Sequence, residues 1–274
     1  MSRGKDTKQY EVVLALSVDE KRRVAENPST TAEVLAVLAM DEDLDVRQVV
    51  AGNPNAPREV LAMLAMDENW EIRRAVAWNP SSPADVLAVL AMDEVWFVRK
   101  AMARNPNTSA ETLEKLAADK NSEVREAVAR NPRSPETILI RLSRDRSLRV
   151  REAAAENANT PADVLAVLAR DKLWEVRRTV AENVSTSAEV LVELGTDENS
   201  DVRRGVAGNL NTPETILIRL SRDHSPRIRE AVARSPKIPQ DVAINLSTSQ
   251  VSRIRQALAE NPAVPEHIRV GLSL

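Results

Sequence analysis

The chain has 274 residues, of which 43% are hydrophobic but only 2% aromatic, so any core that it builds must be aliphatic. Lys and Arg total 38 against 41 Asp and Glu, which differs from the strongly basic balance of a protein dedicated to coating nucleic acid. The absence of cysteine excludes disulfides, Cys-ligated zinc and Cys-ligated iron–sulfur clusters.

Residues 1–26 are predicted to form a polar tail followed by an N-terminal cap. Met1 to Tyr10 lacks the apolar region of a signal peptide. No apolar run approaches the roughly 20 residues that span a bilayer. We therefore expect a cytoplasmic protein without membrane contact.

A 26-residue unit then recurs nine times without a gap from Asn27 to Glu260, and its clearest copy is Asn79 to Arg104. Asn, Leu, Asp, Arg and Ala each return in a column of their own, with Ser235 and Ser249 as exceptions in the Asn and Asp columns. Such a period predicts a repeat protein in which each unit buries its apolar face against its neighbours.

Each unit is predicted to hold two short helices. The first is expected to begin at a Ser/Thr column whose hydroxyl caps free backbone N–H groups, with Pro next and an acid three residues on. That column consists of Thr30, Ser82, Thr108, Ser134, Thr160, Thr186 and Thr212. The second helix carries V-R-x-x-V-A and should end at the Asn column, because Asn tolerates the left-handed conformation and a Pro often follows. Its length fits either an α- or a 3₁₀-helix.

Residues 261–274 supply one more helix of the first type and form a C-terminal half-repeat. The expected terminal face, around Val270 and Leu274, is a candidate for self-association.

The pattern VRxxVAxNPxTPxxVLxxLAxD resembles the leucine-rich repeat variant family over residues 21–274. The resemblance implies a right-handed solenoid of alternating α- and short 3₁₀-type helices without β-sheet. Some relatives carry a Cys-bound iron–sulfur module ahead of the repeats, but this chain has no Cys, and we expect no cofactor. The fold is therefore predicted to be an all-α superhelix, one continuous domain of nine full repeats at residues 27–260 between end caps.

Two invariant polar columns are interpreted as scaffold. Arg47 and its counterparts can meet the Asp of their own repeat or of an adjacent one and form a structural ladder rather than a phosphate groove. The Asn column is expected to hydrogen-bond backbone rather than ligand.

Variable columns are better candidates for binding, and several gather at the corner between the two helices. Tryptophan and methionine are enriched at protein interfaces, which favours a partner surface there, with Trp78 in another variable column. The alternative is that each Trp merely covers its own helix pair. The predicted partner-binding residues are Met66, Trp70, Met92, Trp96, Phe97 and Trp78.

The same corner becomes mostly basic from the fifth repeat onward. Its arginines suggest an alternative function, in which the solenoid binds nucleic acid through its phosphates. The candidate anion-binding residues are Arg144, Arg146, Arg170 and Arg222.

Catalytic motifs are not found. His224 and His267 are the two histidines, and no nucleophile–base constellation, Gly-rich phosphate loop or metal-ligand spacing accompanies them. The leading hypothesis is a non-enzymatic scaffold, without a metal, that binds a protein partner.

Overall fold

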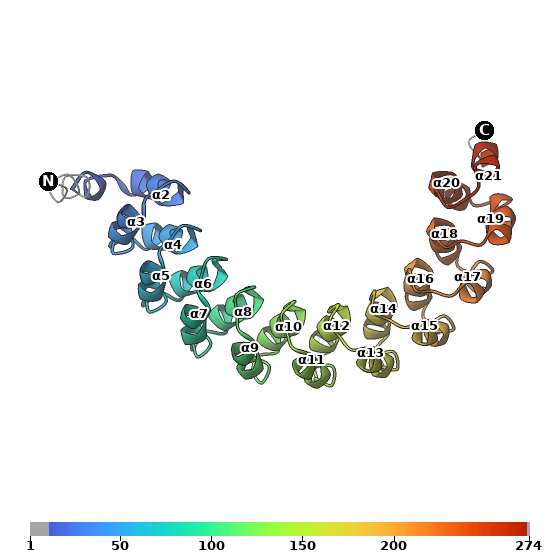
Figure 1. Ribbon diagram of the computed structural model, residues 1–274, viewed down its shortest axis with the longest axis horizontal. Helices are drawn as coiled ribbons and strands as arrows, with labels where there is room; N and C mark the ends of the chain where they lie inside the picture. Colours follow the sequence, from blue (N-terminus) through green and yellow to red (C-terminus); the bar gives the residue numbers. More distant parts are fainter. Residues whose placement is uncertain (1–10, 273–274) are drawn as a thin grey trace. The chain divides into compact units, whose positions relative to one another are not determined.

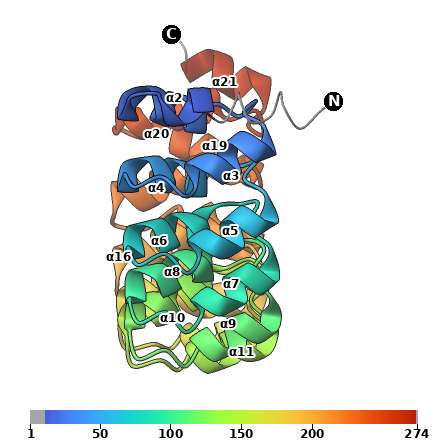
Figure 2. The same cartoon turned by 90° about the vertical axis from the view of Figure 1, so that its left-hand side faces the viewer.

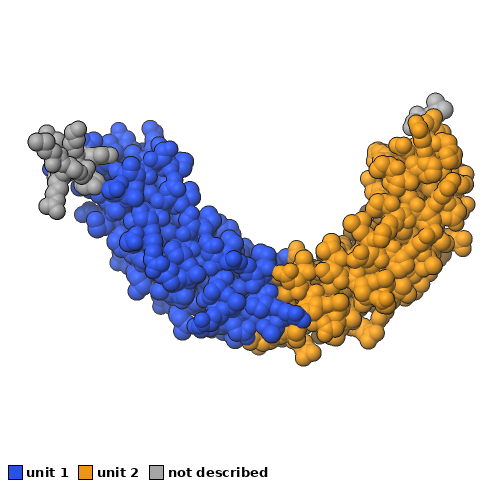
Figure 3. Space-filling view, viewed as in Figure 1, with its two compact units in different colours: residues 1–138 blue, residues 139–274 orange. Residues whose placement is uncertain are grey.

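The computed structural model describes residues 11–272, and the chain divides into two compact units, residues 1–138 and 139–274 (Figure 3). The helices of unit 1 are α2 (Val18–Glu26), α3 (Ala32–Leu38), α4 (Leu44–Gly52), α5 (Arg58–Leu64), α6 (Trp70–Trp78), α7 (Ala84–Leu90), α8 (Trp96–Arg104), α9 (Ala110–Leu116) and α10 (Ser122–Arg130). Helix α11 (Glu136–Leu142) contains the division. The helices of unit 2 are α12 (Leu148–Glu156), α13 (Ala162–Leu168), α14 (Trp174–Glu182), α15 (Ala188–Leu194), α16 (Ser200–Gly208), α17 (Glu214–Leu220), α18 (Pro226–Arg234), α19 (Gln240–Ser247), α20 (Ser252–Glu260) and α21 (Glu266–Leu272).

The helices form two layers in each unit. The odd-numbered helices, here called first helices, follow one another on one side, and the even-numbered second helices follow one another on the other (Figures 1 and 2). Each repeat pairs one of each, from α3–α4 to α19–α20, which confirms the all-α solenoid of paired helices. Both are α-helical, so the choice left open for the second helix is resolved. Residues 11–272 contain no β-strand.

The core lies between the layers and is aliphatic, as predicted. In the first full repeat, α3 buries Val34, Leu35 and Leu38, while α4 buries Val46 and Val50. Burying a Leu or Val side chain contributes about 1.5–3 kcal/mol. Helices of seven or nine residues are marginal alone in water, so stacking of neighbouring repeats stabilises them.

The Ser/Thr column does not cap the first helix, and this prediction is wrong. Thr108 is buried and its hydroxyl donates 2.6 Å to the carbonyl oxygen of Met102, six residues earlier in the preceding second helix. The N-cap is the next residue, Ser109, whose hydroxyl accepts from the backbone N–H of Thr112. The same hydroxyl-to-carbonyl bond closes the end of the preceding helix for Thr30, Ser82, Ser134, Thr160, Thr186 and Thr212.

The proline that often follows that column was predicted at the first helical position and instead occupies the N-cap. Pro83 has φ −66° and ψ 151° there, and the first turn begins after it. Acidic residues of the first turn, such as Asp85 in α7, lie as predicted where the helix dipole favours negative charge.

The Asn column ends the second helix in an extended conformation, not in the predicted left-handed one. Asn105 has φ −68° and ψ 130°, and residues 11–272 contain no non-glycine residue with positive φ. Pro106 disfavours the α region for the residue before it, but Asn183, which Val184 follows, is extended as well, so the proline is not required. The buried side chain of Asn105 donates to the carbonyl oxygens of Ala77 and Asn79 at 2.9 and 2.8 Å. The column thus hydrogen-bonds backbone, as expected, and joins each repeat to the preceding one.

Replacing Ser235 by Asn is expected to stabilise unit 2 by about 1 kcal/mol, because it restores this link. The Ser235 hydroxyl accepts from the backbone N–H of Lys237 at 3.3 Å, whereas Asn209, one repeat earlier, also donates to two carbonyl oxygens at 2.8 Å. The urea midpoint of Ser235→Asn should rise while that of Ser235→Ala does not. Equal midpoints for Ser235→Asn and the wild type would contradict this account.

Candidate functional site

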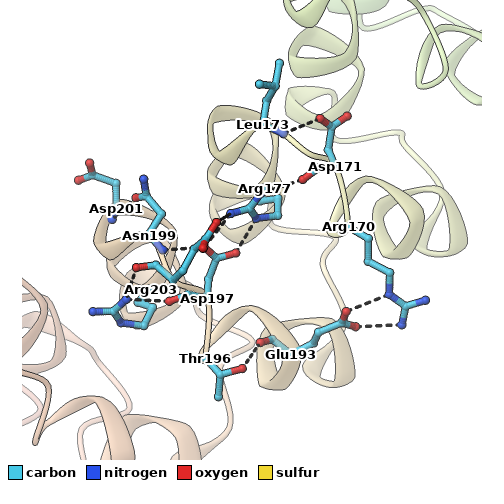
Figure 4. Close-up of polar contacts among 11 residues, drawn as sticks. Arg170, Asp171, Leu173, Arg177, Glu193, Thr196, Asp197, Asn199, Asp201 and Arg203 are labelled. Carbon is cyan, nitrogen blue, oxygen red and sulfur yellow. Dashed lines mark hydrogen bonds and ion pairs between the residues drawn. The ribbon is translucent and has the colours of Figure 1, made fainter.

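The arginine column forms a ladder with the Asp column of the next repeat. In unit 2, Arg177 Nε donates 2.6 Å to Asp197 Oδ2 and its Nη2 donates 3.0 Å to Oδ1, while Nη1 donates 2.8 Å to the carbonyl oxygen of Asp171 (Figure 4). Corresponding pairs are Lys21–Asp41, Arg47–Asp67, Arg73–Asp93, Arg99–Asp119, Arg151–Asp171 and Arg203–Asp223. The ladder interpretation is confirmed, with the adjacent repeat's Asp as the carboxylate partner.

Electrostatics support a structural role for these pairs. Burial alone would raise the pKa of Asp197, but hydrogen bonds from Arg177 and the Asn199 backbone, with the charges of Arg177 and Arg203, bring that pKa below its usual value. The hydrogen bond to Asp197 raises the pKa of Arg177 despite its burial. The guanidinium groups of these pairs are thus neutralised within the scaffold.

Trp70, Trp96 and Phe97, three of the predicted partner-binding residues, form an aromatic cluster at the start of two second helices. Trp70 opens α6 and Trp96 opens α8, and the ring of Phe97 stacks between them, with centroids 5.6 Å from Trp70 and 3.8 Å from Trp96. The guanidinium of Arg74 lies 5.1 Å from the Trp70 ring centroid, and Lys100 Nζ lies 5.6 Å from that of Trp96. Cation–π contacts at these distances hold both rings in place.

A groove of about 420 Å³ runs over the second helices beside this stack. Its apolar surface comes from Trp78, Phe97, Ala75 and Ala101. Alanines 75 and 101 share one small-residue column, which leaves room for a hollow between α6 and α8. Trp78 is 60% exposed and Phe97 42% exposed, so both present ring surface to solvent.

Cations outnumber acids along the same groove. Arg74, Lys100 and Arg104 line it together with one carboxylate, Glu71. Lys100 also pairs with Glu123 at 2.5 Å, whereas Arg104 is exposed at the end of α8. The groove therefore combines aromatic walls with a net positive charge.

A second hollow of about 440 Å³ adjoins the first on the side of α4. It is lined by Val49, Gly52 and Arg22, and it shares Gln48, Ala75 and Trp78 with the first. Trp78 thus stands between two hollows, and their row follows α2, α4, α6 and α8. We call the two hollows and their lining the tryptophan groove.

The predicted methionines lie elsewhere. Met66 and Met92 are 72% and 83% exposed at the corner between the helices and do not contribute to the lining of the tryptophan groove. Of the six predicted residues, Trp78 and Phe97 line the groove, and Trp70 and Trp96 support Phe97 from outside the lining.

Sequence analysis missed Arg74, Lys100, Arg104 and the alanine floor. The available signal was the variability of one further column of the second helix, which reads Gln48, Arg74, Lys100, and of the column of Trp78 already noted, in which Arg104 follows.

Of the four arginines predicted to bind anions, three have exposed side chains and one is engaged in an ion pair. Arg144, Arg146 and Arg222 are exposed, but Arg170 donates to both carboxylate oxygens of Glu193 at 2.9 and 3.1 Å (Figure 4).

Of the residues predicted for the C-terminal face, Val270 is exposed on α21, and Leu274 lies outside the described residues. Self-association through that end stays a prediction.

Over residues 11–272, no group of three or more His, Asp or Glu side chains is arranged to hold a metal ion. Nor does this part of the chain contain a helix with the length and apolar character needed to cross a membrane.

Comparisons with known proteins agree with the repeat architecture. A protein-family model described as leucine-rich repeat variant domain matches residues 19–77. A second family model, described as leucine rich repeat variant, matches residues 96–121 and 174–199. A solved structure described as a leucine-rich repeat variant with a novel repetitive structural motif is 28% identical, with a TM-score of 0.59, and the match covers 79% of this chain and 87% of that one.

More distant structures are also similar. An engineered protein is 17% identical with a TM-score of 0.41, covering 97% of this chain and 98% of its own. Importin beta is 11% identical with a TM-score of 0.34, covering 93% of this chain and 41% of its own. The search of curated proteins gave no match. The chain thus carries leucine-rich repeat variant sequences at residues 19–77, 96–121 and 174–199, and no catalytic domain is identified in it.

Proposed function

We propose that this leucine-rich repeat variant solenoid is a non-enzymatic scaffold that binds a protein partner through the tryptophan groove of unit 1. The single observation that carries the proposal is the joint placement of Trp78 and Phe97, both substantially exposed, on either side of a groove of about 420 Å³. In a chain with 4 Trp and 1 Phe, this concentration of exposed ring surface is exceptional.

The lining supports an extended or helical segment of a partner as the occupant. Aromatic side chains in partly desolvated pockets contribute most of the binding free energy at protein interfaces. The alanine floor admits one bulky apolar side chain between Trp78 and Phe97. The surrounding Arg74 and Arg104 favour carboxylates beside it, because complementary charge steers association and fixes register, whereas Lys100 is already paired with Glu123.

Peptide selection on the full-length protein tests the proposal. From a random displayed library, we expect enrichment of sequences with a bulky apolar residue flanked by Asp or Glu. Trp78→Ala and Phe97→Ala should each weaken binding of the selected peptides about thirtyfold, corresponding to a loss of about 2 kcal/mol. Fluorescence anisotropy measures the affinities, and circular dichroism verifies that the variants stay helical.

Trp174→Ala is the matched control. Trp174 occupies the same column as Trp70 and Trp96 and lies under Arg178 at 5.6 Å, but its repeat has Glu182 at the position of Trp78. Its replacement should leave peptide affinity unchanged. The proposal fails if the selected peptides bind Trp78→Ala and Phe97→Ala as tightly as the wild type.

The nucleic-acid alternative has weaker support, because Arg170 is already engaged with Glu193. It predicts binding of labelled DNA or RNA near 50 mM salt that falls steeply as salt rises. Binding of that kind, lost on charge reversal of Arg144 and Arg146 but insensitive to Trp78→Ala, would favour the alternative over the scaffold.

A further inference from the structure

The Asp column of unit 2 is interrupted at one position, where Ser249 stands in place of the carboxylate. Arg151, Arg177 and Arg203 each donate through Nε and Nη2 to the Asp of the next repeat. The next member, Arg229, has Ser249 at the corresponding position. Within residues 139–272 the structure gives Arg229 no ion pair with a carboxylate.

Arg229 is nevertheless held as the other ladder arginines are. Its Nη1 donates 2.6 Å to the carbonyl oxygen of Asp223 and 3.1 Å to that of His224. Arg203 Nη1 makes the same two contacts one repeat earlier, at 2.7 and 3.0 Å. Since Arg203 makes these two bonds while its Nε and Nη2 contact Asp223, the Nε–Nη2 edge of Arg229 is expected to face residue 249.

The backbone of that rung is also preserved. Arg255 Nη1 donates 2.6 Å to the carbonyl oxygen of Ser249, just as Arg203 Nη1 donates 2.7 Å to that of Asp197. The Ser249 hydroxyl accepts from the backbone N–H of Val251 at 3.3 Å, in the way Asp197 Oδ1 accepts from that of Asn199. Only the carboxylate differs, so a preorganised pair of donors has lost its acceptor.

We propose that Arg229, beside Ser249, is a binding site for a carboxylate supplied by another polypeptide. The two N–H groups form the bidentate fork that matches a planar carboxylate. In the neighbouring rung the same fork holds Asp223 at 2.8 and 3.3 Å. Arg229 and Ser249 are both partly exposed, so the position is open to solvent. This site lies on unit 2 and does not depend on the tryptophan groove.

The Nε–Hε resonance of Arg229 reports directly on the fork, and Arg229→Lys identifies it by its loss. At constant ionic strength, N-acetylglycine and N-acetylaspartate α-amide serve as probes for a chain terminus and a side chain. We expect a saturable shift with at least one of the two, and their relative affinities show which source of carboxylate the site prefers. A response to neither probe, or an equal response to chloride, overturns the proposal.

Two variants separate the site from general surface charge. Ser249→Asp should supply a carboxylate that accepts from Arg229 Nε and Nη2. The Nε–Hε resonance of Arg229 should then move to where those of the other ladder arginines lie. Probe binding should weaken at least about tenfold, because the new side chain occupies the site. Asp197→Ser should create the same vacancy at Arg177 and make its resonance responsive to the probes. If Ser249→Asp binds the probes as the wild type does, Arg229 is not the site, whatever happens in the tryptophan groove.

Discussion

Asp197→Ala is expected to lower the free energy of unfolding by about 3 kcal/mol, the lower end of the range for breaking a buried ion pair. Side chains 177 and 197 are only 12% and 7% exposed, so removal of the carboxylate leaves the Arg177 guanidinium short of a partner where water reaches it poorly. Its remaining bond to the Asp171 carbonyl oxygen keeps the loss from being larger. The variant also loses the acceptor for the Asn199 backbone N–H.

Glu198→Ala is the matched control for that experiment. Glu198 also approaches Arg177, with Oε1 3.6 Å from Nη2, but its side chain is 90% exposed. An exposed contact of this kind contributes little, because water and salt screen it. The urea midpoint of Asp197→Ala should therefore be clearly lower than that of the wild type, whereas the midpoint of Glu198→Ala should equal that of the wild type. Similar midpoints for both variants would show that the ladder does not stabilise the fold.

The consequence should extend beyond one pair. In a repeat protein each unit contacts mainly its neighbours, so stability depends on the interfaces between successive units. The ladder and the Asn column both cross such an interface. Hydrogen exchange should consequently accelerate most in α14, which contains Arg177, and in α16, which begins just after Asp197.

The repeated columns made the scaffold predictable, since a residue that returns every 26 positions must meet the same environment each time. Which Asp each arginine meets was left open, because both the Asp six residues earlier and one in an adjacent repeat were within reach. The structure uses both. The earlier one accepts through its backbone carbonyl and the one 20 residues later through its carboxylate.

The Ser/Thr column was misinterpreted because local sequence gives two acceptable caps. A threonine before a proline and an acid has the pattern of an N-cap, but its hydroxyl can also donate backward to the end of the preceding helix. Thr160, which stands before Pro161 and Asp163, does the latter, and burial of its side chain decides the matter, since a turn on the surface would expose it. Burial of one polar position between two helices depends on their packing angle, which the sequence does not show.

The tryptophan groove could be predicted only in part for a related reason. A partner surface was expected at the corner, and Trp78 was counted among its residues although it lies in another variable column than Phe97. They meet because the second helices lie side by side, so that the end of α6 and the start of α8 flank one hollow. Met66 and Met92 stay outside the groove because they lie in the turns that follow first helices, whereas the groove is lined mainly by second helices.

Acid is expected to destabilise the protein progressively once the pH falls below about 4, the ordinary pKa of aspartate. The pKa values of Asp41, Asp119, Asp171, Asp197 and Asp223 are all lowered by hydrogen bonds and nearby cations that outweigh burial. A carboxylate with a lowered folded pKa contributes its full stabilisation above the unfolded value and loses it as the pH falls through the folded value. Stability should accordingly be level from pH 7 to 5 with respect to these groups and then decline.

Asp197→Ala supplies the internal check on this mechanism. Near pH 7 the free energy of unfolding of the wild type should exceed that of the variant by the full contribution of the ion pair. Below the folded pKa of Asp197 the wild type carries a neutral carboxyl group there, so the difference between the two urea midpoints should shrink with falling pH. A difference that stays constant from pH 7 to 3 would mean that the carboxylate charge is not what holds the rung. The stabilisation would then come from the packing of the side chain.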